Sequence, residues 1–98
     1  IYPREIEETL VRYPGVLEAA VVGQPNKLRS EVPYAFVVLS DEAKDNITEA
    51  DLRKHCRMHL GEYKIPEGFA FIDEMPKTAT KKIQKEVLKE KYFTKINA

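Results

Sequence analysis

The stretch YAFVVL, residues 34–39, decides the fold of this 98-residue chain. Its aromatic and β-branched residues suit a pleated surface covered by other parts of a protein, so the stretch indicates a well-buried strand. A second apolar run, VLEAAVVG at residues 16–23, precedes it across a polar loop with prolines on both sides. This arrangement predicts an antiparallel pair of strands. A shorter run, FAFI at residues 69–72, is the third predicted strand.

Helices are predicted before, between and after these strands. The first, PREIEETLVRYPG at residues 3–15, begins with a proline, carries glutamates in its first turns and stops at a Pro-Gly pair. The second runs to about His59 from Thr48, which resembles a capping residue paired with Asp51, and the third begins near Gln84. The side chains predicted to face inward are Ile6, Leu10 and Tyr13, then Leu52, Cys56 and Leu60, then Val87, Leu88 and Tyr92.

The predicted order of elements is therefore α-β-β-α-β-α. It places the chain in the α+β class, as one small domain with a three-stranded mixed sheet and helices packed on it. The composition is that of an ordinary globular protein, with 43% hydrophobic residues and a formal net charge of zero. One cysteine excludes an intrachain disulfide and fits a reducing compartment. With no apolar run of membrane-spanning length and no signal peptide, we expect a cytoplasmic protein.

Several clusters of polar residues have ordinary structural interpretations. His55, Cys56 and His59 share a predicted helix, but no fourth ligand is evident and Cys56 lies on the apolar face, so no metal site is predicted. The adjacent carboxylates at residues 7–8 and 73–74 are interpreted as solvated charges rather than acid–base pairs. No nucleophile elbow or complete phosphate loop is present in the sequence.

The segment PKTATKKIQK, residues 76–85, is the strongest candidate for chemistry. Lys82 lies in a loop between a predicted strand and a predicted helix, with apolar anchors at both ends. A lysine held in this way is a point charge that can be aimed at a phosphate or a carboxylate. From composition alone, a pair of solvated surface lysines is the favoured alternative.

Four segments together resemble a known family. They are IYPREIEETLVRYPGVLEAAVVGQPN, RSEVPYAFVVL, LGEYKIP and MPKTATKKIQK, in this order along the chain. The chain resembles, over essentially all of its length, the C-terminal lid domain of the adenylate-forming enzyme superfamily, and it is most similar to acyl-CoA synthetases. The resemblance implies that residues 1–98 are a mobile lid whose hinge and large N-terminal domain are absent from this sequence.

The resemblance also implies an activity. Enzymes of this family use ATP and Mg²⁺ to convert a carboxylic acid into an acyl-adenylate, and coenzyme A then attacks to give the thioester. Lys82 matches the catalytic lysine, whose ammonium offsets the repulsion between the carboxylate and the α-phosphate. The main ATP and Mg²⁺ sites belong to the N-terminal domain, so the isolated lid is expected to be a folded, inactive monomer.

A second face of the lid is implied to meet coenzyme A. The residues that match this face are Arg29, Arg57, Ile65, Pro66 and Glu67. Glu67 replaces a basic residue of relatives, and Ser30 and Lys81 replace glycines. If these glycines have positive φ in relatives, a side chain there costs about 1 kcal/mol.

Two alternatives to the enzyme lid stay open. The first is an interaction module in which the basic segment Lys77–Lys95 binds nucleic acid or an acidic partner. We expect no nucleic-acid partner, because the segment's aromatics, Tyr92 and Phe93, come late and are not interleaved with its lysines. The second is a regulatory remnant that has lost catalysis, which the replacement of a glycine by Lys81 keeps under consideration.

Overall fold

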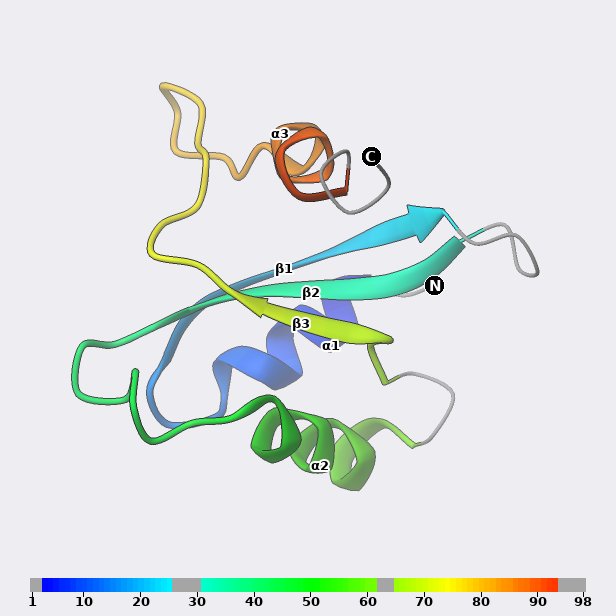
Figure 1. The fold of residues 1–98 in the computed structure, drawn as a ribbon, viewed down its shortest axis with the longest axis vertical. Coiled ribbons are helices and arrows are strands. Elements are labelled where there is room, and N and C mark those ends of the chain that lie inside the picture. The colour runs from blue at the N-terminus through cyan, green and yellow to red at the C-terminus, as the bar shows by residue number, and fades with distance from the viewer. Residues whose placement is uncertain (1–2, 26–30, 62–64, 94–98) are drawn as a thin grey trace.

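The computed structural model describes residues 3–25, 31–61 and 65–93 of the chain. The elements follow the predicted α-β-β-α-β-α order, with a π-helical turn continuing the last helix (Figure 1). They are α1 Pro3–Val11, β1 Val16–Pro25, β2 Glu31–Leu39, α2 Glu49–Leu60, β3 Gly68–Phe71, α3 Lys85–Leu88 and the π-helical turn η2 Lys89–Phe93. The α+β class is confirmed. No helix within these described ranges is long and apolar enough to cross a membrane.

The three strands form one mixed sheet, as predicted, and they lie in the order β1-β2-β3. Strand β2 pairs antiparallel with β1, where Ala20 lies opposite Phe36, and parallel with β3, where Ala70 lies opposite the same residue. Helices α1 and α2 cover one face of the sheet and α3 lies over the other (Figure 1). The apolar run of residues 34–39 therefore forms the central strand, and both of its faces are covered.

The two faces of the sheet have separate hydrophobic cores. On the helix α1 and α2 side, Ile6 and Leu10 pack with Leu52, Cys56 and the facing strand residues. On the α3 side, Phe36 packs with Met75, Leu88 and Phe93. The domain is thus layered as helices, sheet and helix, and each layer is held mainly by burial of apolar side chains.

Two helix boundaries follow from local signals. The capping box predicted for α2 is present, since Thr48 Oγ1 accepts from the Asp51 amide at 3.2 Å and Asp51 Oδ2 accepts from the Thr48 amide at 2.9 Å. Helix α1 ends at Val11, earlier than the Pro-Gly stop predicts. The chain then turns, yet Tyr13 still packs on the core and against the His55 ring, with 5.2 Å between ring centroids.

The end of the chain corrects one prediction. Val87 was expected to face inward, but it is 37% exposed, whereas Phe93 is buried at 4%. The physical reason is the π-helical turn that follows α3 directly. A π-helical turn brings residues five apart onto one side, which aligns Leu88 with Phe93 toward the sheet.

Candidate functional site

The candidate catalytic segment is a short β-hairpin, residues 76–84, which we call the lysine hairpin. Lys77 and Ile83 form an antiparallel bridge, and the Gln84 amide donates to the Pro76 carbonyl at 2.8 Å. Toward the tip, the Thr78 amide donates to the Lys82 carbonyl at 2.9 Å. Figure 1 shows the hairpin, in yellow and orange, projecting from the sheet beside α3.

The tip of the lysine hairpin is a three-residue loop that ends in a left-handed residue. The Lys81 amide donates to the Thr78 carbonyl at 2.9 Å, which closes a turn through Ala79 and Thr80. Lys81 has φ 68° and is the one residue other than glycine with positive φ in the described ranges. Loops of this kind combine a turn with a left-handed residue and favour glycine at that position. This geometry explains why a glycine is the expected residue where this chain has lysine.

The backbone of Lys82 is held by hydrogen bonds, whereas its side chain is exposed to solvent. Its amide donates to Thr78 Oγ1 at 3.2 Å, and that hydroxyl lies 3.0 Å from the hydroxyl of Thr80. The Lys82 side chain is exposed, and no carboxylate of the described residues pairs with its ammonium. The Lys82 ammonium could therefore bind an anion, while hydrogen bonds of the hairpin hold its backbone.

The base of the lysine hairpin is joined to the rest of the domain by two ion pairs. Lys77 Nζ lies 2.7 Å from Glu18 Oε2 on β1, and Lys85 Nζ lies 2.8 Å from Glu7 Oε2 on α1. Lys77 and Lys85 thus have carboxylate partners, in contrast to Lys82.

Glu7 corrects a second prediction. It was interpreted as a solvated carboxylate, but its side chain is only 22% exposed. The oxygen that meets Lys85 also accepts from the Val21 amide of the β1 edge at 2.7 Å. Its neighbour Glu8 does behave as predicted, because it is 58% exposed and, among the described residues, pairs only with Arg4, at 3.4 Å.

The stretch predicted to meet coenzyme A is held by an arginine that the sequence did not single out. Arg53 of α2 donates to the carbonyls of Pro66 at 3.0 Å and Glu67 at 3.3 Å. Glu49, one turn earlier, pairs with Arg53 at 3.2 Å and accepts from the Phe69 amide at 3.3 Å. The only local signal was the i,i+4 spacing of this Glu–Arg pair, which does not reveal its distant partners.

The other residues predicted for this face are only partly brought together. Arg57 lies one helical turn beyond Arg53 and is exposed, and Ile65 packs partly against the core on the α2 side. Pro66 is fully buried, whereas Glu67 is exposed and its amide donates to the Pro33 carbonyl at 2.7 Å. Arg29 and Ser30 lie outside the described residues.

The two predicted sites lie on different sides of the sheet. The lysine hairpin is anchored by Met75 and Ile83 in the core on the α3 side. The 65–67 stretch belongs to the α2 side, where Ile65 packs on the other core. A large partner can therefore meet one site while the other faces elsewhere.

The surroundings of three other titratable groups, Cys56, Tyr34 and His55, indicate structural roles. Burial raises the pKa of the Cys56 thiol to about 11, so the thiol is protonated at neutral pH and is a poor nucleophile. Burial, and secondarily the Glu49 carboxylate, raise the pKa of the Tyr34 hydroxyl. His55 Nε2 lies 2.8 Å from the Thr9 carbonyl. Within the described ranges, no group of three or more His, Cys, Asp or Glu side chains could hold a metal ion.

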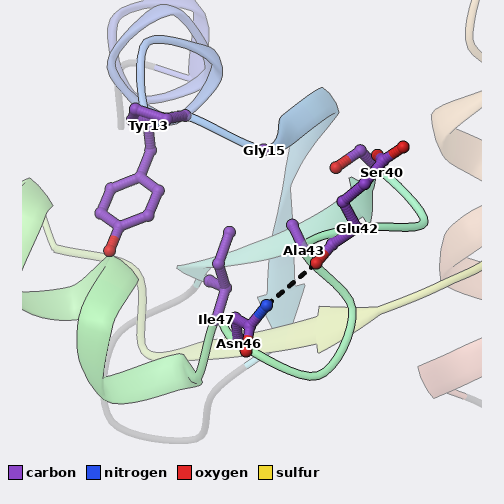
Figure 2. A pocket seen from close by; sticks show the side chains of 8 residues that line it. Tyr13, Gly15, Ser40, Glu42, Ala43, Asn46 and Ile47 are labelled. Carbon is purple, nitrogen blue, oxygen red and sulfur yellow. Dashed lines mark hydrogen bonds between the residues drawn. The ribbon is translucent and has the colours of Figure 1, made fainter.

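A shallow pocket of about 690 Å³ lies away from both predicted sites. Figure 2 shows it between the turn that follows α1 and the loop that follows β2, where Asn46 Nδ2 donates to the Glu42 carbonyl at 3.0 Å. Gly15 on its floor has φ 100°, and a Cβ there would lie 2.6 Å from the Ala43 Cβ. A side chain at residue 15 would therefore be strained, and the pocket contains none of the predicted site residues.

Comparison with known proteins identifies relatives along nearly the whole chain. Residues 5–82 match the family described as AMP-binding enzyme C-terminal domain. A 2-succinylbenzoate–CoA ligase of Listeria monocytogenes is 44% identical over 92 residues, which make up 94% of this chain and 19% of the ligase.

Solved structures give the same picture. A Mycobacterium tuberculosis fatty acyl CoA synthetase superposes with a TM-score of 0.87 at 35% identity, over 96% of this chain and 18% of the synthetase. ATP-bound MatB from Rhodopseudomonas palustris superposes with a TM-score of 0.87 at 36% identity, over 94% and 18%. The chain therefore spans about a fifth of the length of the relatives that it matches.

Proposed function

Because the chain belongs to the AMP-binding enzyme C-terminal domain family, we propose that it is the mobile C-terminal domain of an ATP-dependent, AMP-forming acyl-CoA synthetase. The whole enzyme would join a carboxylic acid to AMP and then transfer the acyl group to coenzyme A. Its partner would be its own large N-terminal domain, which would hold the acid, ATP and Mg²⁺. We expect this ligase to be cytoplasmic.

The lysine hairpin is the observation that carries this proposal. Its backbone bonds hold Lys82 in one register, and the Lys82 ammonium has no ion-pair partner in the described part of the chain. In the adenylation step, the acid's carboxylate oxygen attacks the α-phosphorus of ATP and pyrophosphate leaves. Two anions must approach each other, so a positioned cation lowers the barrier by offsetting their repulsion.

The second step would use the α2 side of the domain. There the thiol sulfur of coenzyme A attacks the acyl carbon, and AMP leaves. Arg57 would attract the anionic nucleotide part of coenzyme A, and the 65–67 stretch would lie along the cofactor. Because this face and the lysine hairpin lie on different sides of the sheet, the domain would rotate between the two steps.

The interaction module receives less support. Three lysines of its basic segment already have carboxylate partners: Lys77 with Glu18, Lys85 with Glu7, and Lys89 with Glu86. The regulatory remnant was suggested by Lys81, yet the hairpin keeps its backbone pairing with lysine in the left-handed position. A replaced glycine alone therefore does not argue for lost catalysis.

Replacing Lys82 in the full-length enzyme tests the proposal. Lys82→Ala should slow adenylation, measured as pyrophosphate exchange, by the equivalent of about 3–4 kcal/mol. Thioester formation from a presynthesised acyl-adenylate should persist, because that step uses the other face. Lys81→Ala is the matched control and should keep most of the exchange activity. If Lys81→Ala abolishes exchange while Lys82→Ala spares it, the catalytic register is wrong by one residue.

A further inference from the structure

The backbone bonds of the lysine hairpin do not by themselves set its direction relative to the sheet. It has few backbone bonds, its tip is exposed, and a two-stranded hairpin is at best marginally stable in water. Its pairing fixes Lys82 relative to Thr78 but not relative to the sheet. Ile83 packs at the base of the hairpin on the core of the α3 side, and further contacts at this base would help to set the direction in which Lys82 points.

The ion pairs at its base have the geometry to do so. Lys77 lies in the first arm of the hairpin and Lys85 directly follows the second arm. The two ion pairs therefore hold the two ends of the hairpin. Their carboxylates come from β1 and α1, on the N-terminal part of the chain. All four side chains are between 22% and 40% exposed, so the pairs are partly shielded from solvent and are screened less than fully exposed pairs.

Glu7 is the firmer of the two anchors. Its Oε2 meets both Lys85 Nζ at 2.8 Å and the Val21 amide at 2.7 Å. The edge of the sheet thus holds the carboxylate, and the carboxylate holds the residue that begins α3. This chain of contacts runs from the sheet to a position three residues from Lys82.

We propose that Glu7, assisted by Glu18, is a positioning residue that aims Lys82 at the reacting phosphate. This inference rests on the proposed function, because it assumes that Lys82 acts in adenylation. Glu7 itself touches no substrate. A displacement of about 1 Å in a catalytic group can reduce a rate about 100-fold, so loosening one anchor should be measurable.

The test uses Glu7→Gln in the full-length enzyme. Glutamine keeps an oxygen that can accept from Val21 but loses the charge that attracts Lys85. We expect the kcat of pyrophosphate exchange to fall about tenfold or more, with little change in the KM for ATP. Thioester formation from presynthesised acyl-adenylate should be unchanged. Glu8→Gln is the matched control, since Glu8 is a neighbouring exposed carboxylate on the same helix, and its ion pair in the described part of the chain is with Arg4.

The second anchor offers a rescue experiment. Glu18→Lys or Lys77→Glu alone places like charges together and should lower exchange, whereas the double variant restores opposite charges and should recover much of the rate. If Glu7→Gln and Glu18→Lys both keep full exchange activity while Lys82→Ala loses it, the positioning role is wrong and the proposed function stands. If Lys82→Ala itself keeps full exchange, the proposed function fails first. Equal losses in both half-reactions would overturn the positioning role in favour of general structural support.

Discussion

Replacing Lys81 by glycine should stabilise the domain. The left-handed conformation at φ 68° costs a residue with a Cβ about 1–2 kcal/mol. Glycine removes that cost, but it gains conformational entropy in the unfolded chain worth about 0.5–1 kcal/mol. The expected net increase in the free energy of unfolding is about 0.5–1 kcal/mol. For a domain of this size, that corresponds to an increase in Tm of roughly 2–8 °C.

The charge of Lys81 must be separated from its backbone conformation. Like Lys81→Gly, Lys81→Ala removes the ammonium and with it any repulsion from neighbouring lysines. Unlike glycine, alanine keeps the Cβ, so the backbone strain remains. The difference in the free energy of unfolding between the glycine and alanine variants therefore reports the effect of the backbone conformation. Lys81→Asn should fall between them, since asparagine tolerates the left-handed region better than most residues.

Urea unfolding of the 98-residue chain, followed by circular dichroism, measures these differences. A shift in midpoint at constant m-value reports stability rather than a changed unfolded state. If Lys81→Gly is no more stable than Lys81→Ala, then the left-handed conformation costs no more than the entropy that glycine adds to the unfolded chain, and the reasoning is refuted. In the full-length enzyme, Lys81→Gly should leave adenylation intact, because the hairpin already has the geometry that glycine would adopt.

Three further predictions concern other parts of the domain. Gly15→Ala should destabilise it by about 2 kcal/mol or more in the same urea assay, because a Cβ at φ 100° would also lie 2.6 Å from the Ala43 Cβ. Arg53→Ala should free the 66–67 carbonyls and slow thioester formation while sparing pyrophosphate exchange, and an equal loss in both assays would contradict this assignment. Cys56 should resist thiol reagents at pH 8 in the folded protein and react in urea. Since folding raises its pKa from 9.0 to about 11, the folded state holds the proton longer, and stability should fall as the pH rises from 9 to 11.

The buried strand at residues 34–39 and the loop that carries Lys82 could be predicted from local patterns. The apolar run at 34–39 has no polar alternation, which already indicates a strand covered on both faces. The side chains of Thr48 and Asp51 form the capping box that marks the start of α2, and both residues are visible in the local sequence. The placement of Lys82 in a loop between a strand and a helix is likewise a local property, and the family resemblance sets its register.

The end of the chain shows where local patterns are insufficient. Helical periodicity placed Val87 inward, but a π-helical turn places Phe93 there instead. A prediction from periodicity assumes a uniform helix. The ring of Phe93 contacts those of Phe36 and Tyr34, with 5.9 and 5.4 Å between ring centroids, and these are tertiary contacts. The sequence contains the apolar residues but not the geometry that chooses between them.

By itself the sequence determined the α+β class, the mixed sheet, the family and the candidate lysine, because each depends on residues close together in the chain or on motifs in a fixed order. Only the tertiary structure decided how the lysine hairpin is held. Glu7 and Lys85 come from opposite ends of the sequence, as do Glu18 and Lys77. A carboxylate in an amphipathic helix has the same local pattern whether it is solvated or paired. Its partner is set by which distant segments the two hydrophobic cores bring together, and that becomes known only when the chain has folded.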